Sequence, residues 1–278
     1  MNKRTIARDL SFRGVGIHTG RIVDLALRPS DSGEIVFRRT GAEGPGLVLD
    51  PRATGARNCS YLESEHGRIE TVEHLLAALA VFGVDSLDVV TNGPEIPILD
   101  GSAQPFAEAL AAAGTRPAGP GGKVMKIVAP FIVEDGGASV EAAPDPGLRI
   151  SYLIAFDHPA IGTQSADFRV TTESFRSEIA PARTFGFLKD VPELHRRGLA
   201  LGGSFANSLV LDDEKVVNGP LRFPDEFVRH KVLDLVGDLF LLGVPVRGHF
   251  KARKAGHALH IKAVRYLLEH PECREYVE

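Results

Sequence analysis

The sequence predicts an α+β fold of two similar domains, each a sheet with helices, with the helices sandwiched between the two sheets. The chain has 278 residues, which is long for one hydrophobic core and fits two domains of about 100 to 150 residues. Strand-like runs come in blocks before the helices, without the regular alternation of strand and helix that a parallel α/β sheet requires.

A run rich in Pro and Gly divides the chain near its middle. Residues 115–122 read TRPAGPGG, and such a segment is expected to continue neither a helix nor a sheet. We therefore predict an N-terminal α+β domain of residues 1–116 and a C-terminal α+β domain of residues 123–278.

Both halves begin with runs that are typical of strands. In the first half these are residues 22–27 and 34–37, and in the second half they are residues 123–133 and 148–156. Such runs are rich in β-branched and aromatic residues and lie between turn residues, so each half is expected to start with part of a sheet.

Each half then reaches an amphipathic helix. Thr71 is expected to cap the first helix, in which apolar residues recur at i, i+3, i+4 and i+7 until Gly83. Asp225 is expected to cap a longer helix that ends before Gly243. Both helices open with Val-x-His, which indicates a weak internal duplication and predicts that they pack against each other. Further helices are expected at about residues 103–113 and 257–269.

Composition and charge exclude several classes of protein. The net charge of -4 and the isoelectric point near 6.2 argue against a nucleic-acid binder, which would normally have a basic domain. The start of the chain has no apolar core of a secretory signal, and no apolar run reaches the about 18 to 20 residues of a spanning helix. We therefore expect a cytoplasmic protein without a membrane span, and nothing in the sequence demands more than a monomer.

One long stretch has only positive charges. Residues 239–268 contain no Asp or Glu. The Lys and Arg residues in this stretch are Arg247, Lys251, Arg253, Lys254, Lys262 and Arg265. Such a stretch is typical of a solvated basic face, and it also fits a site for an anionic ligand such as a phosphate.

The second helix carries a candidate metal site. His230, Asp234 and Asp238 are four residues apart, so they lie one above another on one helix face. Imidazole nitrogen and carboxylate oxygen can hold one zinc ion together, and three protein ligands with a water molecule are usual in catalytic zinc sites. The alternative is an exposed polar face beside Arg229 and Lys231.

Four other residues are candidates with simpler alternatives. Glu73 and His74 place a carboxylate and an imidazole side by side, as in metalloprotease helices, but charges at a helix start also interact with the helix dipole. His257 could stabilise an oxyanion or protonate a leaving group, or it could be a surface histidine. Cys59 could lie near a metal, but the sequence favours a small buried hydrophobe.

Several long motifs together resemble those of UDP-3-O-acyl-N-acetylglucosamine deacetylases, and the resemblance covers nearly the whole chain. The motifs are GVGIHTG at 14–20, TVEHL at 71–75, PEIPILDGS at 94–102, ARTFGF at 182–187, GGS at 202–204, FVRHKVLD at 227–234 and GH at 256–257. The family hydrolyses the acetamide of UDP-3-O-acyl-N-acetylglucosamine with zinc, releasing acetate and committing the nucleotide-sugar to lipid A in Gram-negative bacteria. The resemblance therefore implies a zinc-dependent amidohydrolase acting on this small molecule.

The resemblance also implies a role for individual residues of the site. It implies that His74, His230 and Asp234 bind zinc, that Glu73 is the general base, that His257 stabilises the oxyanion and protonates the leaving amine, that Asp238 orients His257, and that Thr184 donates a hydroxyl to the oxyanion. Cys59 matches a cysteine near the metal in some members of the family.

Residues 185–203 match an insert that forms a passage for the fatty acyl chain. The substrate-binding residues that the resemblance implies are Phe185, Leu188, Leu199, Leu201 and Gly203 in or beside this passage, and Lys231 and Lys254 near the substrate. The two lysines would give the basic stretch a reason, namely the diphosphate of UDP. The chain departs from the family pattern at Ala206 and Ala255.

Two other functions remain open from the sequence. One is a catalytically inactive relative that binds nucleotide-sugars, although the presence of Glu73 and His257 argues against pure binding. The other is a zinc hydrolase for a different amide, which an apolar passage of another length would allow.

Overall fold

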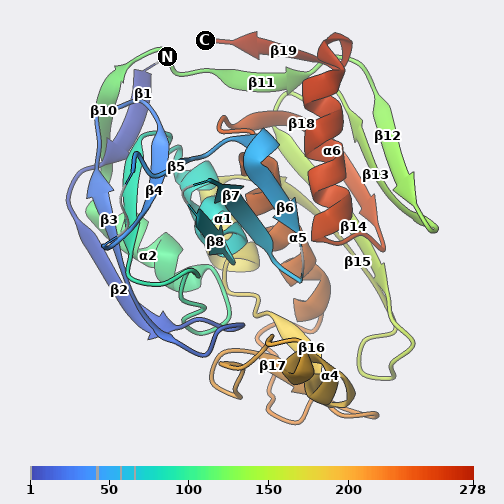
Figure 1. Cartoon of the computed structure of the whole chain (residues 1–278). Coiled ribbons are helices and arrows are strands. Elements are labelled where there is room, and N and C mark those ends of the chain that lie inside the picture. The colour runs from blue at the N-terminus through green and yellow to red at the C-terminus, as the bar shows by residue number, and fades with distance from the viewer. Residues whose placement is uncertain (1, 42–43, 57, 66) are drawn as a thin grey trace.

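The computed structural model confirms a mixed α and β fold with several sheets, and it describes residues 2–41, 44–56, 58–65 and 67–278. In Figure 1 the helices α1 and α5 lie in the middle of the molecule, with N-terminal strands on one side and C-terminal strands on the other. The chain termini lie close together at one end of the molecule.

The larger sheet of the first half has five strands in the order β2-β3-β9-β4-β5. Their bounds are Leu10–Val15, Ile22–Pro29, Leu87–Thr91, Ile35–Arg39 and Leu47–Val48. In β3 the side chains of Val23, Leu25 and Leu27 are buried while their neighbours are more exposed. This alternation is expected of a strand with one face against a core, and it confirms the strands predicted in the first half.

Two smaller sheets complete the first half. One contains β6 (Thr54–Ala56), β7 (Ser60–Ser64) and β8 (Gly67–Glu70). The other pairs β1 (Asn2–Ile6) with β10 (Thr115–Pro120) in an antiparallel manner. The expectation that residues 115–122 cannot continue a sheet was therefore wrong. Two prolines fit in β10 because this strand pairs with β1 alone, so not every residue of β10 has to donate an N–H to a neighbouring strand.

The sheet of the second half has seven strands. They are β11 (Val124–Ile127), β12 (Phe131–Asp135), β13 (Ala138–Ala143), β14 (Leu148–Ala155), β15 (Thr163–Val170), β18 (Val246–Arg253) and β19 (Arg274–Val277). The run predicted at 123–133 is two strands, since Val128, Ala129 and Pro130 separate β11 from β12. The run predicted at 148–156 is confirmed as β14.

The four main helices lie where the sequence placed them. They are α1 (Glu73–Phe82), α2 (Gln104–Ala113), α5 (Glu226–Phe240) and α6 (His257–Glu269). Helix α1 packs directly against α5, as the matching Val-x-His starts predicted. Helix α5 also contacts β14 and β15, and α6 contacts β12 and β13, so the helix pair joins both halves.

Neither predicted N-cap side chain caps its helix. The residue before α1 is Val72, while Thr71 has a φ of 60° and its Oγ1 donates to Glu95 Oε1 at 2.9 Å. Asp225 does precede α5, but its carboxylate accepts from Arg229 Nε at 2.6 Å instead of from the helix backbone. Thr71 thus donates to a distant carboxylate and Asp225 accepts from a basic side chain, and neither accepts from the helix backbone.

The segment from Phe185 to Leu211 forms a separate small unit. It contains β16 (Phe185–Phe187), which pairs in parallel with β17 (Leu209–Leu211), and the short helix α4 (Val191–Arg196). This unit lies below the helix pair in Figure 1. Its helix was not predicted, and neither were α3 (Thr172–Ser174) and the π-helical turn Phe175–Ile179 that follows it.

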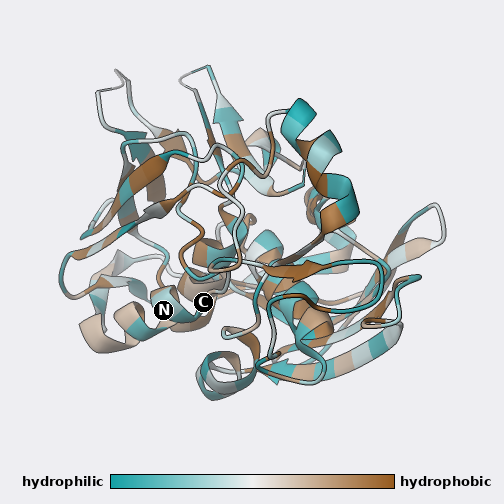
Figure 2. Cartoon of the chain, turned by 90° about the horizontal axis from the view of Figure 1, so that it is seen from below, coloured by the Kyte–Doolittle hydropathy of each residue, from teal (hydrophilic) through white to brown (hydrophobic). Residues whose placement is uncertain are grey.

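The hydropathy of the residues follows the layers of the fold. In Figure 2 apolar and polar residues alternate along several strands and lie on different faces of the helices. This is the pattern of elements with one buried face. Among the described residues, no helix combines the length and the apolar character that crossing a membrane would need.

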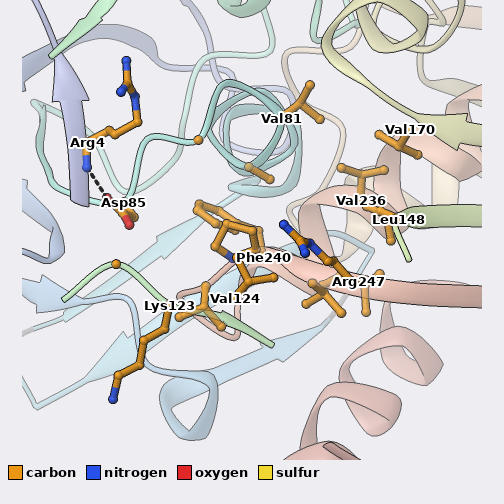
Figure 3. A pocket seen from close by; sticks show the side chains of 18 of the residues that line it. Arg4, Val81, Asp85, Lys123, Val124, Leu148, Val170, Val236, Phe240 and Arg247 are labelled. Carbon is orange, nitrogen blue, oxygen red and sulfur yellow. Dashed lines mark hydrogen bonds between the residues drawn. The ribbon is translucent and has the colours of Figure 1, made fainter. Parts of the chain in front are cut away.

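A cavity of about 520 Å³ opens between the two halves at the C-terminal ends of α1 and α5. Val81, Val236 and Phe240 form part of its wall, and Arg4 and Arg247 also line it (Figure 3). Beside this cavity the backbone N–H of Arg4 donates to Oδ1 of Asp85. The catalytic candidates lie at the opposite, N-terminal end of α1 and do not line this cavity.

The close approach of α1 and α5 depends on Gly237. A Cβ at this position would lie 2.0 Å from the carbonyl oxygen of Glu73, which is backbone and cannot rotate away. Gly237→Ala would gain about 1 kcal/mol of helix propensity, but overpacking costs about 1–3 kcal/mol and such a contact lies at the upper end. We expect urea denaturation to report a net loss of about 1–2 kcal/mol in the free energy of unfolding.

A matched control separates this contact from a general effect of replacing glycine. At Gly147 the nearest atom to an added Cβ lies 3.6 Å away, so Gly147→Ala should keep the parental stability. A Gly237→Ala protein that is as stable as the parent would contradict the packing described for the helix pair.

Candidate active site

A second cavity, of about 380 Å³, brings together most of the residues that the sequence singled out. It lies where the N-terminal part of α1 meets α5, α6 and the unit from Phe185 to Leu211. The predicted residues that line it are Cys59, Glu73, His74, Thr184, Phe185, Gly203, His230, Lys231, Asp234 and His257. Residues more than 150 positions apart in the chain therefore share one cavity.

His74, His230 and Asp234 form a tight cluster in this cavity. Nε2 of His230 lies 3.3 Å from Oδ1 of Asp234, and Nε2 of His74 lies 3.7 Å from the same oxygen. All three side chains are buried. The alternative of an exposed polar face on α5 is thus wrong, and the three atoms are close enough to bind one metal ion.

The donor atoms of the cluster suit a metal. Oδ1 of Asp234 is buried and has no hydrogen-bond partner within the described part of the chain, which is costly unless an ion occupies the site. His230 Nδ1 lies 3.1 Å from the carbonyl oxygen of Ala182, which fixes the tautomer that leaves Nε2 free as a ligand. The residues therefore fit a metal held by two nitrogens and one oxygen, a set that zinc accepts.

Charge states in the cluster agree with this interpretation. Burial lowers the pKa of His230 to about 3, against the opposing effect of Asp234, so its imidazole is neutral and can bind a cation. Burial alone would raise the pKa of Asp234, but His230 and Lys231 outweigh burial and hold it well below the usual range. Lys231 Nζ donates to Asp234 Oδ2 at 2.6 Å, which leaves Oδ1 facing the two histidines.

Glu73 lies beside the cluster without being part of it. Its Oε2 accepts from the backbone N–H of Ser60 at 3.1 Å, and its Oε1 lies 3.8 Å from His257 Nε2. Burial raises the pKa of Glu73, although His257 opposes the shift. A carboxylate with a raised pKa that faces the cavity is suited to take a proton near neutral pH.

His257 is held by a carboxylate behind it. Its Nδ1 lies 2.7 Å from Oδ2 of Asp238, and its Nε2 faces Glu73 and Asp234. Burial alone would lower the pKa of His257, but Asp238 and Asp234 outweigh burial and raise it to about 9. His257 is therefore a cation at neutral pH, with its Nε2–H directed toward the cavity.

Thr184 is placed by the segments on either side of it. Its backbone N–H donates to Gly101 O at 2.7 Å, and the preceding Arg183 pairs with the buried Glu226, with Nε 2.8 Å from Oε1. Gly101 is needed here, because a Cβ would lie 2.2 Å from Asn207 O. These contacts join the ILDGS and ARTFG motifs and set Thr184 in the cavity wall.

Glu95 explains the motif at residues 14–20. Its buried carboxylate accepts from the backbone N–H groups of His18 and Thr19, each at 2.9 Å. A Cβ at Gly16 would lie 2.3 Å from Oε2 of Glu95. The carboxylate thus shapes the turn between β2 and β3. This turn contacts the unit from Phe185 to Leu211, because the Leu201 N–H donates to the His18 carbonyl oxygen.

One side of the cavity has an apolar wall. The apolar residues that line it in the unit from Phe185 to Leu211 are Phe185, Phe187, Leu188, Val191, Leu194, Phe205 and Val210. Leu199 and Leu201, which the sequence placed in the passage, do not line the cavity. Leu199 is buried, and Leu201 is 52% exposed. Ala200, which lies between them, does line the cavity.

The basic stretch does not gather around the cavity. Arg265 donates to Thr54 O, Lys262 lies 3.8 Å from Asp135, and Arg247 lines the other cavity. Lys254 is exposed with a φ of 50° and does not line the cavity, unlike Lys231. The strand β18 and the helix α6 point these side chains in different directions, so they form no single patch around this cavity, and a diphosphate contact of the stretch stays a prediction.

Sequence reasoning missed four residues around the predicted ones. Ser60 Oγ donates to Asp238 Oδ1, and His260 Nδ1 lies 2.7 Å from Asp238 Oδ2. Tyr152 contacts His260, and Ala182 O contacts His230. A signal existed for His260 only, since it follows His257 by three residues on one helix face. Cys59 is buried as expected, and burial raises the pKa of its thiol.

Comparison with known proteins yields one family. The sequence model of the family described as UDP-3-O-acyl N-acetylglycosamine deacetylase matches residues 3–269. A relative from Oleidesulfovibrio alaskensis is 46% identical over 280 residues, which cover 98% of this chain and 90% of the relative. One from Myxococcus xanthus is 45% identical, covering 99% and 89%. One from Histophilus somni is 42% identical, covering 100% and 93%. All three are named UDP-3-O-acyl-N-acetylglucosamine deacetylase.

Proposed function

Because the chain belongs to the UDP-3-O-acyl N-acetylglycosamine deacetylase family, we propose that its cavity hydrolyses the acetamide of UDP-3-O-acyl-N-acetylglucosamine with the help of zinc. The products are acetate and the free amine of UDP-3-O-acyl-glucosamine, which commits the sugar to lipid A. The observation that carries the proposal is the buried cluster of His74, His230 and Asp234 beside Glu73 and His257.

The metal ligands in this proposal are His74, His230 and Asp234. The unpartnered Oδ1 of Asp234 and the neutral His230 support zinc, because two nitrogens and one oxygen leave a position open for water or substrate. When bound, zinc would supply a Lewis acid that polarises a carbonyl and makes water more acidic.

The proton transfers are assigned to Glu73 and His257. Glu73 takes a proton from the water molecule that attacks the acetamide carbonyl, since its raised pKa suits a base near neutral pH. His257, protonated and held by Asp238, stabilises the oxyanion with its Nε2–H and then gives this proton to the nitrogen as the C–N bond breaks. The hydroxyl of Thr184 donates a hydrogen bond to the same oxyanion.

The rest of the cavity is assigned to substrate binding. The apolar wall formed by residues such as Leu188, Val191 and Leu194 supports a passage for the acyl chain, with Phe185 and Gly203 nearer the reacting groups. Lys231 supports contact with the anionic nucleotide-sugar, although its ammonium already pairs with Asp234. Lys254 remains a predicted contact to the nucleotide outside this cavity.

A charge in the passage tests the acyl assignment. Leu194→Asp should lower kcat/KM for the acylated substrate by about 10- to 100-fold, since a buried carboxylate beside an apolar chain costs about 1–3 kcal/mol. The loss should be much smaller with an analogue that has no acyl chain. Leu201→Asp is the matched control, because the same change on an exposed side chain outside the cavity should affect both substrates little. Equal losses on the two substrates for Leu194→Asp would refute the passage.

Acetate release from UDP-3-O-acyl-N-acetylglucosamine, measured with and without a chelator, tests the proposed function. We expect release that the chelator abolishes and added zinc restores. Binding of the nucleotide-sugar without release would indicate a catalytically inactive relative. Release from other acetamides but not from this one would indicate a hydrolase for a different amide.

Two properties follow from the proposal and stay predictions. A nucleotide-linked substrate favours a cytoplasmic location. A monomer is the predicted oligomeric state, which sedimentation would measure.

A further inference from the structure

Asp238 is the centre of a buried network that extends beyond His257. Its Oδ1 accepts from Ser60 Oγ, and its Oδ2 lies 2.7 Å from Nδ1 of both His257 and His260. Asp238 and His260 are both fully buried. Burial alone would raise the pKa of Asp238, but His257 and His260 outweigh burial and lower it to about 2. Asp238 is thus an anion that accepts from three side chains.

The network continues from His260 to the segment that leads into α6. Nε2 of His260 lies 2.9 Å from the hydroxyl oxygen of Tyr152, and the same hydroxyl lies 2.8 Å from Ala255 O. Tyr152 comes from β14 and is 1% exposed. While His260 is neutral, the single hydroxyl proton of Tyr152 serves either Ala255 O or His260 Nε2, and both acceptors stay within reach.

The start of α6 follows closely on strand β18, and the Lys254 N–H donates to Leu153 O at 2.8 Å. No side chain caps the helix, Lys254 has a φ of 50°, and Gly256 is extended. His257 is the first helical residue. Its backbone position therefore depends on the Ala255 segment, and its ring depends on Asp238. The pair of Tyr152 and His260 contacts both of these supports.

We propose that His260 and Tyr152 are positioning residues for the deacetylation, holding Asp238 and the Ala255 carbonyl so that His257 Nε2 stays directed at the cavity. This inference rests on the proposed function for its kinetic consequences. Neither residue lines the cavity, so neither touches the reacting atoms. Partners behind a catalytic group restrict its rotation, and their loss commonly costs about 10- to 100-fold in activity.

Variants at His260 separate positioning from packing. His260→Leu keeps a similar volume and removes both ring nitrogens. His260→Asn retains one N–H donor near the position of Nδ1, so it can still donate to Asp238 although it does not reach Tyr152. Tyr152→Phe removes only the hydroxyl. Val264→Ala, four residues further along α6 and fully buried, perturbs packing without touching the network and is the matched control.

We expect the zinc-loaded His260→Leu protein to lose about 10- to 100-fold in kcat, with KM and zinc content close to the parent. His260→Asn should recover most of this loss, and Tyr152→Phe should show a smaller one. Val264→Ala should lower the melting temperature and keep kcat. A parental kcat in His260→Leu would overturn the proposal, and so would a His260→Asn protein as slow as His260→Leu.

Crystal structures of the zinc-loaded variants test the same point without turnover. The separation of His257 Nδ1 and Asp238 Oδ2 is 2.7 Å in the parent. We expect it to lengthen in His260→Leu, with a shifted ring at His257, and an unchanged ring would overturn the proposal. If the parent releases no acetate from the acylated sugar, the proposed function fails, and these structures still decide whether His260 positions His257.

Discussion

Glu73→Gln is expected to lower turnover by about 10²- to 10⁴-fold, the usual scale for a missing general base. Glutamine keeps the size of the side chain and can still accept from the Ser60 N–H, but its amide takes no proton at neutral pH. Consecutive residues on a helix diverge by about 100°, so Glu73 and His74 cannot occupy the same coordination position. Zinc and substrate should therefore still bind, which metal analysis and substrate titration would measure.

Glu70→Gln is the control for the loss of a nearby negative charge. Glu70 pairs with Arg68 and does not line the cavity, so this variant should turn over at about the parental rate. His74→Ala should differ from Glu73→Gln by losing metal as well as rate. A Glu73→Gln protein that has lost its zinc, or that keeps the parental rate, would place the base elsewhere.

His230→Ala is expected to lower zinc content and activity together. Removing Nε2 of His230 leaves His74 and Asp234 as protein ligands and opens the buried site to water. Removing a hydrogen-bond partner of a metal ligand lowers activity by about 10- to 100-fold. His230→Ala removes the ligand itself, so its loss of activity should be larger. Metal analysis of the purified variant and its turnover, with and without added zinc, measure both effects.

An exposed histidine provides the matched control. His270 lies at the end of α6 and pairs with Glu272 on the surface, so His270→Ala should keep zinc and turnover. A His230→Ala protein with full zinc occupancy and normal turnover would remove this residue from the metal site.

The sequence predicted the helix pair from local periodicity, but of the three metal-ligand candidates with this periodicity, Asp238 lies with His257 and His260 instead of in the cluster of His230 and Asp234. The spacing of His230 and Asp234 puts both residues on one face of a helix. The similar start of the helix that contains His74 predicted that α1 packs against α5. The family motifs added Thr184 and gave roles to Glu73 and His257, and the structure places all three in the same cavity. Their catalytic roles remain predictions until they are measured.

The sequence was less informative where contacts between distant segments decide the structure. Tyr152 and His260 are 108 residues apart, and no periodicity links a strand residue to a helix residue at that distance. Leu199 and Leu201 are apolar and lie in the predicted insert, yet neither lines the cavity. Residues 115–120 form a strand because β1, more than 100 residues earlier, offers its edge. Composition alone suggested a linker there.

Diffraction at the zinc absorption edge from crystals of the zinc-loaded protein tests the central claim most directly. We predict one anomalous peak bounded by His74 Nε2, His230 Nε2 and Asp234 Oδ1, the three atoms that lie close together in the cavity. Asp238, His257 and His260 form a second group of potential ligands. A peak at that second group, or no peak at the first, would contradict the assignment of the metal and of the residues that act beside it.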